Sequence, residues 1–196
     1  RQMCIRDRGY NVLATGEMGI GNTTTSSAVC SVLLDQSVEK VTGKGAGLTN
    51  KDLEHKIEVI RQSIALNKVN ADDPLDVLAK VGGLDIAGMA GCYIGGAALN
   101  IPVFIDGFIS SVAALIAIRL VPECAPYLFP SHCSNEPAGH LILDAIGKEP
   151  YILANMCLGE GTGAVMGFTI ADYAFKAYWE LPSFEQTNFG TYEELN

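Results

Sequence analysis

The sequence has few basic residues and no cysteine pair at a metal-binding spacing. Lysine and arginine together number 13 against 22 aspartates and glutamates, a formal net charge of -9, which excludes the basic surface of a nucleic-acid-binding protein. The six cysteines include no C-x-x-C pair, so they indicate neither a zinc site nor a disulfide framework, and we expect reduced thiols in the cytoplasm. The densest apolar run, residues 112–121, is much shorter than the roughly 18 residues that cross a bilayer, so we expect no membrane association.

The sequence does contain enough apolar residues for one core. Its 196 residues are 48% hydrophobic, which is typical of a single globular domain of this length. The chain opens on Arg1, and the charged run of residues 1–8 fits no regular element. We therefore expect residues 1–9 to be a truncated or non-native start and residues 10–196 to form one α/β domain.

Short apolar runs alternate with helical patterns along the chain. The runs that suit buried strands are residues 11–15, 101–105, 127–129 and 151–154. Helices are expected from residue 23 or 24 to about 34, and over 50–64, 86–100, 110–121, 137–146 and 164–176, with a short one from residue 74. This alternation predicts the α/β class, with a Rossmann-like parallel sheet and helices on both faces in three layers.

Local signals mark two of the helix starts. Thr49 precedes Asp52 by three residues, as in a capping box, and Asp73-Pro74 places proline at the first helical position. The helix at residues 86–100 is dense in glycine and alanine, a composition that favours close backbone packing. We therefore expect these glycines in a packed interface rather than in a site.

A single carboxylate, Glu160, stands among glycines at residues 158–163, directly before the helix expected from Ala164. Glycine lets the backbone adopt positive φ and lets a ligand approach, and the helix N-terminus offers unpaired N–H groups to an anion. The segment thus suits an anion site with a base beside it. It equally suits a turn with an acidic cap, and this stretch leaves both interpretations open.

Two further glycine loops precede helices. Residues 16–22 follow the first expected strand but match neither G-x-G-x-x-G nor the Walker pattern, so neither a dinucleotide nor a triphosphate is specifically indicated. Residues 43–47 form the second loop, and Lys56 in the next helix lies off the apolar stripe, where a lysine usually faces solvent. Asp106 follows a strand, so it either points toward the ligand crevice of an open α/β sheet or serves as a cap.

Histidine is scarce, and its spacing does not indicate a metal. His132 and His140 fit no standard ligand pattern, so we expect no metal site. A hydroxyl contact from Ser131 or Ser134 to a phosphate is the favoured interpretation of this segment.

Six motifs together carry a resemblance to a known family. They occur in the family's order and are spread along the chain, so that the resemblance extends over nearly all of residues 10–176, and their combination is far more specific than any one of them. The motifs are GEMGIGNTT (residues 16–24), GKGAGL (43–48), VGGLDIAGMAG (81–91), IPVFIDGFISSVAAL (101–115), SHCSNEPAGH (131–140) and LGEGTGA (158–164). The chain resembles the nicotinate-nucleotide:dimethylbenzimidazole phosphoribosyltransferases of cobalamin lower-ligand assembly.

The resemblance implies roles for individual residues. Glu160 falls on the family's catalytic base, and Glu17 falls on its second carboxylate near the base-binding pocket. Lys56 changes from an expected solvent lysine to an expected ligand contact. The other positions that the resemblance places at the substrates are Gly19, Gly45, Asp85, Asp106, Ser134, Leu158, Gly161, Thr162 and Gly163.

The implied reaction moves ribose 5-phosphate from nicotinate mononucleotide to 5,6-dimethylbenzimidazole, giving α-ribazole 5′-phosphate and nicotinate. The leaving nicotinate starts as a cationic pyridinium and becomes neutral at nitrogen, while one carboxylate takes the benzimidazole proton. The resemblance implies no cofactor, and together with the small-residue helices it suggests a homodimer.

Two departures from the family and two alternatives remain at this point. Cys157 stands where members usually carry arginine, and the family's N-terminal portion, which supplies part of the benzimidazole pocket, has no counterpart in this chain. We therefore expect the chain by itself to be poorly active. The first alternative is a nucleotide- or sugar-phosphate-binding α/β domain of other chemistry, in which Glu160 is only a cap. The second is an inactive structural fragment whose packing glycines resemble a site.

Overall fold

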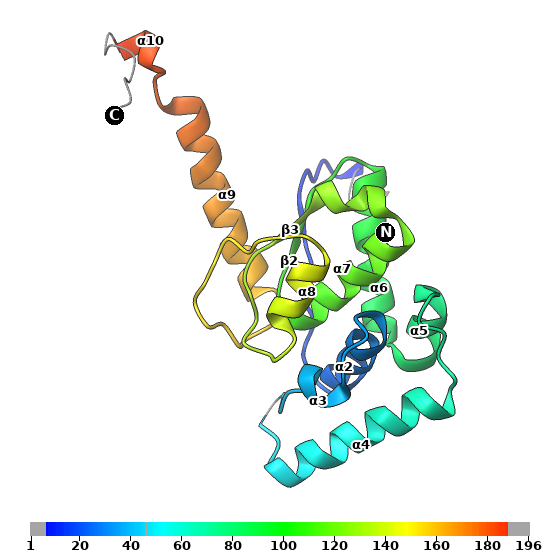
Figure 1. The fold of residues 1–196 in the computed structure, drawn as a ribbon. Helices are drawn as coiled ribbons and strands as arrows, with labels where there is room; N and C mark the ends of the chain where they lie inside the picture. The colour runs from blue at the N-terminus through cyan, green and yellow to red at the C-terminus, as the bar shows by residue number, and fades with distance from the viewer. Residues whose placement is uncertain (1–6, 46, 188–196) are drawn as a thin grey trace, which may run out of the picture.

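The structure, a computed structural model, describes residues 7–45 and 47–187 of the chain (Figure 1). The strands are β1 (Leu13–Ala14), β2 (Val103–Ile105) and β3 (Leu128–Pro130), and a 3₁₀ helix, η1 (Pro122–Tyr127), precedes β3. The α-helices are α2 (Asn22–Leu33), α3 (Val38–Val41), α4 (Asn50–Leu66), α5 (Pro74–Val81), α6 (Leu84–Ala98), α7 (Phe108–Leu120), α8 (Gly139–Ala145), α9 (Thr162–Glu180) and α10 (Phe184–Thr187).

The three strands form one parallel sheet in the order β1-β2-β3. Leu13 pairs with Val103, and Val103 pairs in turn with Leu128. A backbone hydrogen bond from Thr15 N to Phe104 O (3.0 Å) continues the ladder just past β1. Because all three strands run in the same direction, their carboxyl ends lie at one edge of the sheet, where ligands of open α/β sheets bind.

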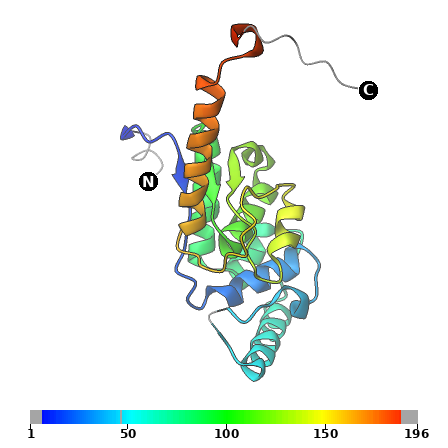
Figure 2. The same cartoon turned by 90° about the vertical axis from the view of Figure 1, so that its left-hand side faces the viewer.

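Helices cover both faces of this sheet (Figures 1 and 2). On one face α6 and α7 pack against β2, and Val103 and Ile105 are fully buried in the core. On the other face lies α9, whose Phe168 ring meets Phe104 edge-on at a centroid distance of 4.9 Å. Side chains alternate along a strand, so β2 sends Phe104 toward α9 and its two neighbours toward the core. The predicted three-layer α/β fold is confirmed.

The core lies on the face covered by α6 and α7. α7 is buried along most of its length, and α2, α5 and α8 pack beside it. Tyr93 of α6 is fully buried, and its hydroxyl bonds the Thr15 hydroxyl (2.6 Å) and donates to Ser110 O (3.1 Å). Burial raises the pKa of Tyr93, so the phenol remains a neutral hydrogen-bonding group that ties the end of β1 to the core.

The helix α9 is mostly uncovered. Of its 19 residues only Gly163, Ala164 and Gly167 are buried, and its second half projects beyond the rest of the molecule (Figures 1 and 2). A Cβ on Gly167 would lie 2.7 Å from the Phe104 ring, so glycine permits the contact between helix and sheet. Although α9 is long and carries apolar residues, neither it nor another helix within the described ranges combines the length and apolarity of a membrane span.

The two helix caps expected from local sequence are confirmed. The Thr49 side chain accepts from Asp52 N (3.2 Å) at the start of α4. The Asp73 side chain accepts from Leu75 N (3.0 Å), and Pro74 is the first residue of α5. Both caps depend on residues within three positions of each other, which is why the sequence reveals them.

The strand predicted at residues 151–154 is wrong. Only Ile152 pairs, in a single parallel bridge with His132, and its N–H donates to Ser131 O (2.9 Å). The apolar run therefore continues the sheet by one residue pair and then leaves it. The segment after Ile152 runs toward α9 as loop.

The packing role predicted for the glycines of α6 is confirmed for Gly96 but not for Gly88 or Gly91. A Cβ on Gly96 would lie 2.5 Å from the Val103 side chain, so the helix needs glycine where it meets β2. Added Cβ atoms on Gly88 and Gly91 would meet open space. Glycine content alone thus does not tell which face of this helix is packed.

Candidate active site

Loops from all three strands meet at the carboxyl edge of the sheet. β1 leads into residues 15–21, β2 into Asp106, and β3 into Ser131 and His132. The segment 158–163, at the start of α9, contacts each of these loops. The edge therefore brings four separate segments of the chain to one place.

Glycine lets the loop at residues 15–21 touch the loop at residues 158–163. A Cβ on Gly16 would lie 2.5 Å from Gly161 Cα and 2.9 Å from the Glu160 carbonyl carbon, so only a hydrogen atom fits there. Glu160 N donates to Glu17 O (2.9 Å) across the same contact. The two glutamates of the candidate site are thus held on adjoining turns.

Glu160 has an unusual backbone conformation. Its φ is 63°, and the φ of the following Gly161 is 83°. A residue with a side chain rarely adopts positive φ, and such a conformation costs on the order of 1–3 kcal/mol unless the surroundings fix it. The turn leaves the Glu160 side chain exposed at the end of α9, where a ligand can reach it.

The Glu17 carboxylate is held by its own loop. Its Oε2 accepts hydrogen bonds from Gly19 N (2.5 Å) and Asn22 Nδ2 (2.6 Å). The same amide nitrogen of Asn22 donates to Asp85 Oδ2 (2.8 Å), so one neutral side chain lies between two carboxylates. Oε1 of Glu17 faces Gly159, where a Cβ would stand 3.4 Å away. Glu17 therefore faces the loop that carries Glu160.

The Asp106 carboxylate bonds the backbone N–H groups at the start of α9. Its side chain is buried, and its Oδ2 accepts from Gly161 N (2.9 Å) while its Oδ1 accepts from Gly163 N (2.8 Å) and Ala164 N (3.3 Å). The N–H groups that the sequence offered to a ligand anion are thus bonded to the chain's own carboxylate. Of the two interpretations that the sequence left open for this stretch, the structure shows the turn with an acidic cap, and the cap is Asp106.

His132 fills the space beneath the same turn. Its imidazole is buried, and Nδ1 bonds the Ser131 hydroxyl (3.0 Å). A Cβ on Gly163 would lie 2.5 Å from His132 Cε1 and 2.8 Å from Asp106 Oδ1, so the third glycine of the motif is required by packing. Burial lowers the pKa of His132, and the charge of Asp106 partly opposes this, so the ring packs in its neutral form.

Lys56 is buried, so the solvent position expected from its place on the helix, which the family resemblance had already replaced by a ligand contact, is wrong. Its Nζ donates to Thr23 Oγ1 (2.9 Å) and to Gly43 O (3.0 Å). Gly45 approaches the same threonine, since a Cβ there would lie 2.9 Å from Thr23 Oγ1. Burial lowers the pKa of Lys56, and the nearby Glu136 carboxylate partly opposes this. The lysine thus joins α4, α2 and the loop at residues 43–47.

Glu136 completes this second cluster. Burial raises the pKa of Glu136, and Lys56 partly opposes the shift. The Glu136 carboxylate lies against Gly43, and Glu136 N donates to the Ser134 hydroxyl (3.3 Å). Gly107 links this cluster to the first, because a Cβ there would stand 3.9 Å from Ser134 Cβ and 3.5 Å from His132 Nε2.

The predicted site residues therefore form two adjoining groups. The first surrounds Glu160 and comprises Glu17, Gly19, Asp85, Asp106, Leu158, Gly161, Thr162 and Gly163. The second comprises Gly45, Lys56 and Ser134. The first turn of α2 joins the groups, because Asn22 bonds the first and Thr23 bonds the second.

Sequence reasoning missed four residues that belong to these groups. Asn22 and Thr23 lie in the motif GEMGIGNTT, and His132 and Glu136 lie in SHCSNEPAGH. What could have identified these four residues as part of the site is that they lie within these motifs. Their partners could not be read from the sequence, because each bonds or packs against a distant segment.

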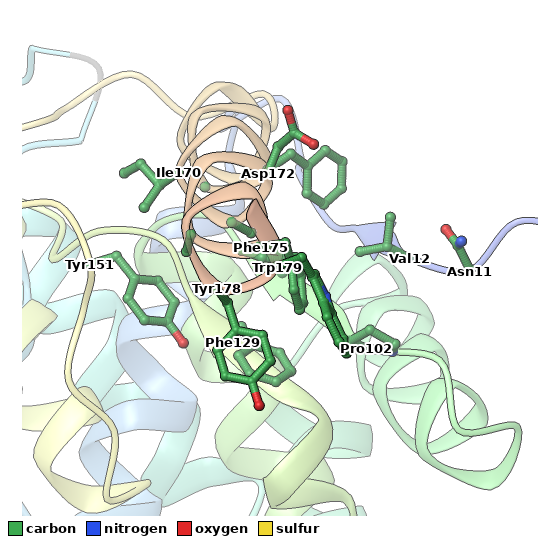
Figure 3. A pocket seen from close by; sticks show the side chains of 15 residues that line it. Asn11, Val12, Pro102, Phe129, Tyr151, Ile170, Asp172, Phe175, Tyr178 and Trp179 are labelled. Atoms are coloured by element: carbon green, nitrogen blue, oxygen red, sulfur yellow. The ribbon is translucent and has the colours of Figure 1, made fainter. Parts of the chain in front are cut away.

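A large apolar groove lies away from this site (Figure 3). It has a volume of about 1010 Å³ between α9 and the uncovered part of the sheet. Pro102, Phe129, Tyr151, Phe175, Tyr178 and Trp179 are among its lining residues, and none of the predicted site residues is. Tyr178 and Trp179 are 77% and 75% exposed, so this is an open apolar surface rather than a site with catalytic groups.

Comparison with known proteins identifies the family. A family model described as Phosphoribosyltransferase matches residues 2–189. A nicotinate-nucleotide–dimethylbenzimidazole phosphoribosyltransferase of Ruminiclostridium cellulolyticum is 52% identical over 97% of this chain and 54% of its own length. One of the same name from Acetivibrio thermocellus is 50% identical over 95% of this chain and 53% of its own. The crystal structure of CobT from Thermus thermophilus matches with a TM-score of 0.89 and 32% identity, over 96% of this chain and 56% of that one.

The match extends over every loop of the candidate site, since residues 2–189 include both groups. The chain spans about half the length of the curated relatives it matches. The resemblance carried by the six sequence motifs is confirmed. The chain therefore belongs to the phosphoribosyltransferase family that includes the nicotinate-nucleotide–dimethylbenzimidazole enzymes.

Proposed function

We propose that this chain is the catalytic part of an enzyme that transfers ribose 5-phosphate from nicotinate mononucleotide to 5,6-dimethylbenzimidazole. The names of the relatives support this donor and this acceptor. The observation that carries the proposal is the contact between the loops at residues 15–21 and 158–163, which holds Glu17 and Glu160 on adjoining turns. In this proposal residues 10–196 act as one catalytic domain.

Glu160 acts as the general base. A benzimidazole nitrogen attacks C1′ of the ribose and forms the new N–C1′ bond, while the bond from C1′ to the nicotinate nitrogen breaks. The bonding pair moves onto that pyridinium nitrogen, which leaves neutral. The proton on the other benzimidazole nitrogen passes to the Glu160 carboxylate, and such a transfer contributes about 10²- to 10⁴-fold to the rate. The exposed side chain of Glu160 suits this role, because the base must reach a bound substrate.

Glu17 acts as the second carboxylate. Positive charge develops at C1′ as the nicotinate leaves, and a fixed negative group close to that carbon stabilises it. Two hydrogen bonds fix Oε2 of Glu17, whereas Oε1 faces Gly159 in the adjoining loop. The carboxylate therefore needs no reorganisation when the charge appears.

The second group of residues holds the phosphate. An ammonium group has three donors, so the bonds of Lys56 to Thr23 and Gly43 leave capacity for a phosphate oxygen. The Ser134 hydroxyl and the backbone at Gly45 lie in the same cluster. Phosphate and reacting carbon would then lie in adjoining parts of one crevice, joined by the first turn of α2, and this orients the donor for in-line attack.

The decisive experiment is the Glu160→Gln variant in an enzyme of the relatives' full length that contains this chain. We expect the turnover for α-ribazole 5′-phosphate, measured by chromatography, to fall by about 10²- to 10⁴-fold. Calorimetry should show unchanged affinity for nicotinate mononucleotide, because Glu160 acts on the acceptor. Glu180→Gln is the matched control and should keep full turnover, because Glu180 is an exposed glutamate at the far end of α9, the helix that follows Glu160.

Two outcomes would contradict the proposal. Wild-type turnover by the glutamine variant would mean that another group takes the proton. Binding of NAD with no binding of nicotinate mononucleotide would favour a nucleotide-binding domain of other chemistry instead.

We further propose a homodimer in the cytoplasm as the working form of the full-length enzyme. The groove beside α9 supports an assembly, because its lining is largely apolar and its aromatic residues Tyr178 and Trp179 are exposed. The reduced thiols of Cys30 and Cys124 are compatible with a reducing compartment. Sedimentation velocity tests the first point and cell fractionation the second. A monomer at micromolar concentration, or recovery outside the cytoplasm, would contradict them.

A further inference from the structure

We propose that Asp106 is a positioning residue that fixes the turn carrying the base Glu160 and does not contact substrate itself. This inference rests on the proposed function of Glu160. The local sequence around Asp106 suits this role and direct contact with a ligand equally well, whereas the geometry of the buried carboxylate favours the positioning role.

Both oxygens of Asp106 are used by the backbone of the turn. Oδ2 accepts from Gly161 N (2.9 Å), and Oδ1 accepts from Gly163 N (2.8 Å) and Ala164 N (3.3 Å). The side chain is only 1% exposed. Three N–H donors at the start of a helix occupy both oxygens of this buried carboxylate, so the group has bonding partners without a substrate.

The carboxylate is anchored to a rigid part of the fold. Asp106 directly follows β2, the central strand of the sheet, whose Ile105 is fully buried. The turn that Asp106 holds lies 55 to 58 residues further along the chain. The contact therefore restrains the turn at residues 158–163 against the central strand of the sheet.

The turn requires such a restraint. Glu160 and Gly161 have φ values of 63° and 83°, and a side-chain residue leaves this region readily when nothing holds it. Glu160 N is held by Glu17 O, and the next N–H, that of Gly161, is held by Asp106. Two consecutive bonds from two different loops thus define the conformation of the base.

Gly163 lets Asp106 come close enough to do this, because a Cβ there would lie only 2.8 Å from Asp106 Oδ1. A Cβ on Gly159 would lie 3.8 Å from Oδ2, an ordinary contact distance. A Cβ on Gly159 would also lie 3.4 Å from Oε1 of Glu17. Asp106 and Glu17 therefore approach the same turn, but the charge of Asp106 is offset by three N–H dipoles at the helix start, which leaves Glu17 to face the crevice.

The first test is amide hydrogen exchange in the chain of 196 residues, without substrates. In Asp106→Asn one oxygen becomes an NH₂ group that cannot accept a hydrogen bond. We expect exchange to become about tenfold faster or more at whichever of Gly161 and Gly163 then faces the NH₂ group, while amides in α6 keep their rates. Ser111→Ala, which removes a nearby buried hydroxyl bonded to Gly107 O, is the matched control and should leave Gly161 and Gly163 unaffected.

A measurement on the wild-type chain tests the inference even when the Asp106→Asn variant does not fold. Scalar coupling across a hydrogen bond should be detected between the Gly163 nitrogen and Cγ of Asp106. Absence of this coupling, or unchanged exchange in a folded Asp106→Asn chain, would overturn the inference.

The second test separates positioning from substrate contact in the full-length enzyme. Asp106→Asn should displace the base by about 1 Å and thereby lower kcat about 100-fold. KM for nicotinate mononucleotide should stay the same, because the donor site is intact. A raised KM with unchanged kcat would show that Asp106 binds the donor and would overturn the inference. If the wild-type enzyme forms no product, the proposed function fails, and the exchange data alone decide the role of Asp106.

Discussion

A single methyl group can test whether the two glutamate-bearing loops must touch. In Gly16→Ala the added Cβ would lie 2.5 Å from Gly161 Cα and 2.9 Å from the Glu160 carbonyl carbon. All of these neighbours are backbone atoms, so no flexible side chain can move aside. The loop at residues 158–163 must therefore shift away from the loop at residues 15–21.

The size of the shift follows from ordinary packing distances. Carbon atoms approach each other to about 3.5–4.0 Å, so the contact at 2.5 Å must open by about 1 Å. The hydrogen bond from Glu160 N to Glu17 O, now 2.9 Å, lies beside this contact and would lengthen with it. A misplacement of about 1 Å costs about 100-fold in rate, which equals about 2.7 kcal/mol of transition-state stabilisation.

The assay compares kcat for α-ribazole 5′-phosphate in Gly16→Ala and Gly88→Ala versions of the full-length enzyme. A Cβ on Gly88 in α6 meets open space, and alanine stabilises a helix by about 0.5–1 kcal/mol relative to glycine. The control should thus keep its turnover and gain a higher Tm. Gly16→Ala should lose turnover and also unfold at a lower temperature, because overpacking costs about 1–3 kcal/mol.

An unchanged kcat in a folded Gly16→Ala enzyme would refute this reasoning. It would mean that the two loops separate without consequence and that Glu17 and Glu160 do not need to act from adjoining turns. A crystal structure of the variant would then show the widened contact directly.

Three further predictions concern single side chains. Lys56→Met should weaken the binding of nicotinate mononucleotide in calorimetry, and it should lower the free energy of unfolding in urea by about 1–3 kcal/mol, because Gly43 O and the half-buried Thr23 hydroxyl lose their donor. The pKa of His132 is lowered by burial, so its contribution to stability is present above the ordinary value near 6.5 and is lost as pH falls through the lowered pKa. Urea unfolding between pH 7.5 and 5 should accordingly show a smaller loss for His132→Gln than for wild type, with the exposed His140→Gln as control; equal losses would exclude the effect. Thr49→Ala should reduce the free energy of unfolding by about 1 kcal/mol, measured the same way, since it removes the cap of α4.

Local sequence predicted the parts of the structure that depend on near neighbours. The caps at Thr49 and Asp73 involve partners two or three residues away, and both were correct. The alternation of apolar runs and helical patterns was enough for the α/β class. The six motifs were enough for the family, because their order along the chain constrains the interpretation more than any one of them.

The sequence could not predict contacts that close over long separations. Lys56 was expected in solvent because its helix position is off the apolar stripe, but its partners lie 13 and 33 residues away. For the helix start behind Glu160 the sequence left an anion site and an acidic cap equally open, and Gly163 N bonds a carboxylate 57 residues earlier, which the local pattern does not show. In both cases a hydrogen bond between distant segments, which the local pattern does not show, determines where the charged side chain lies.

The uncovered face of α9 gives the chain a built-in optical reporter. The only tryptophan in the sequence, Trp179, lines the groove beside the sheet and is largely open to water. Its indole fluorescence should therefore shift to shorter wavelength whenever polypeptide or another copy of the chain covers that face, without any added dye. The same emission should stay unchanged when a ligand fills the crevice around Glu160, because no predicted site residue lines the groove.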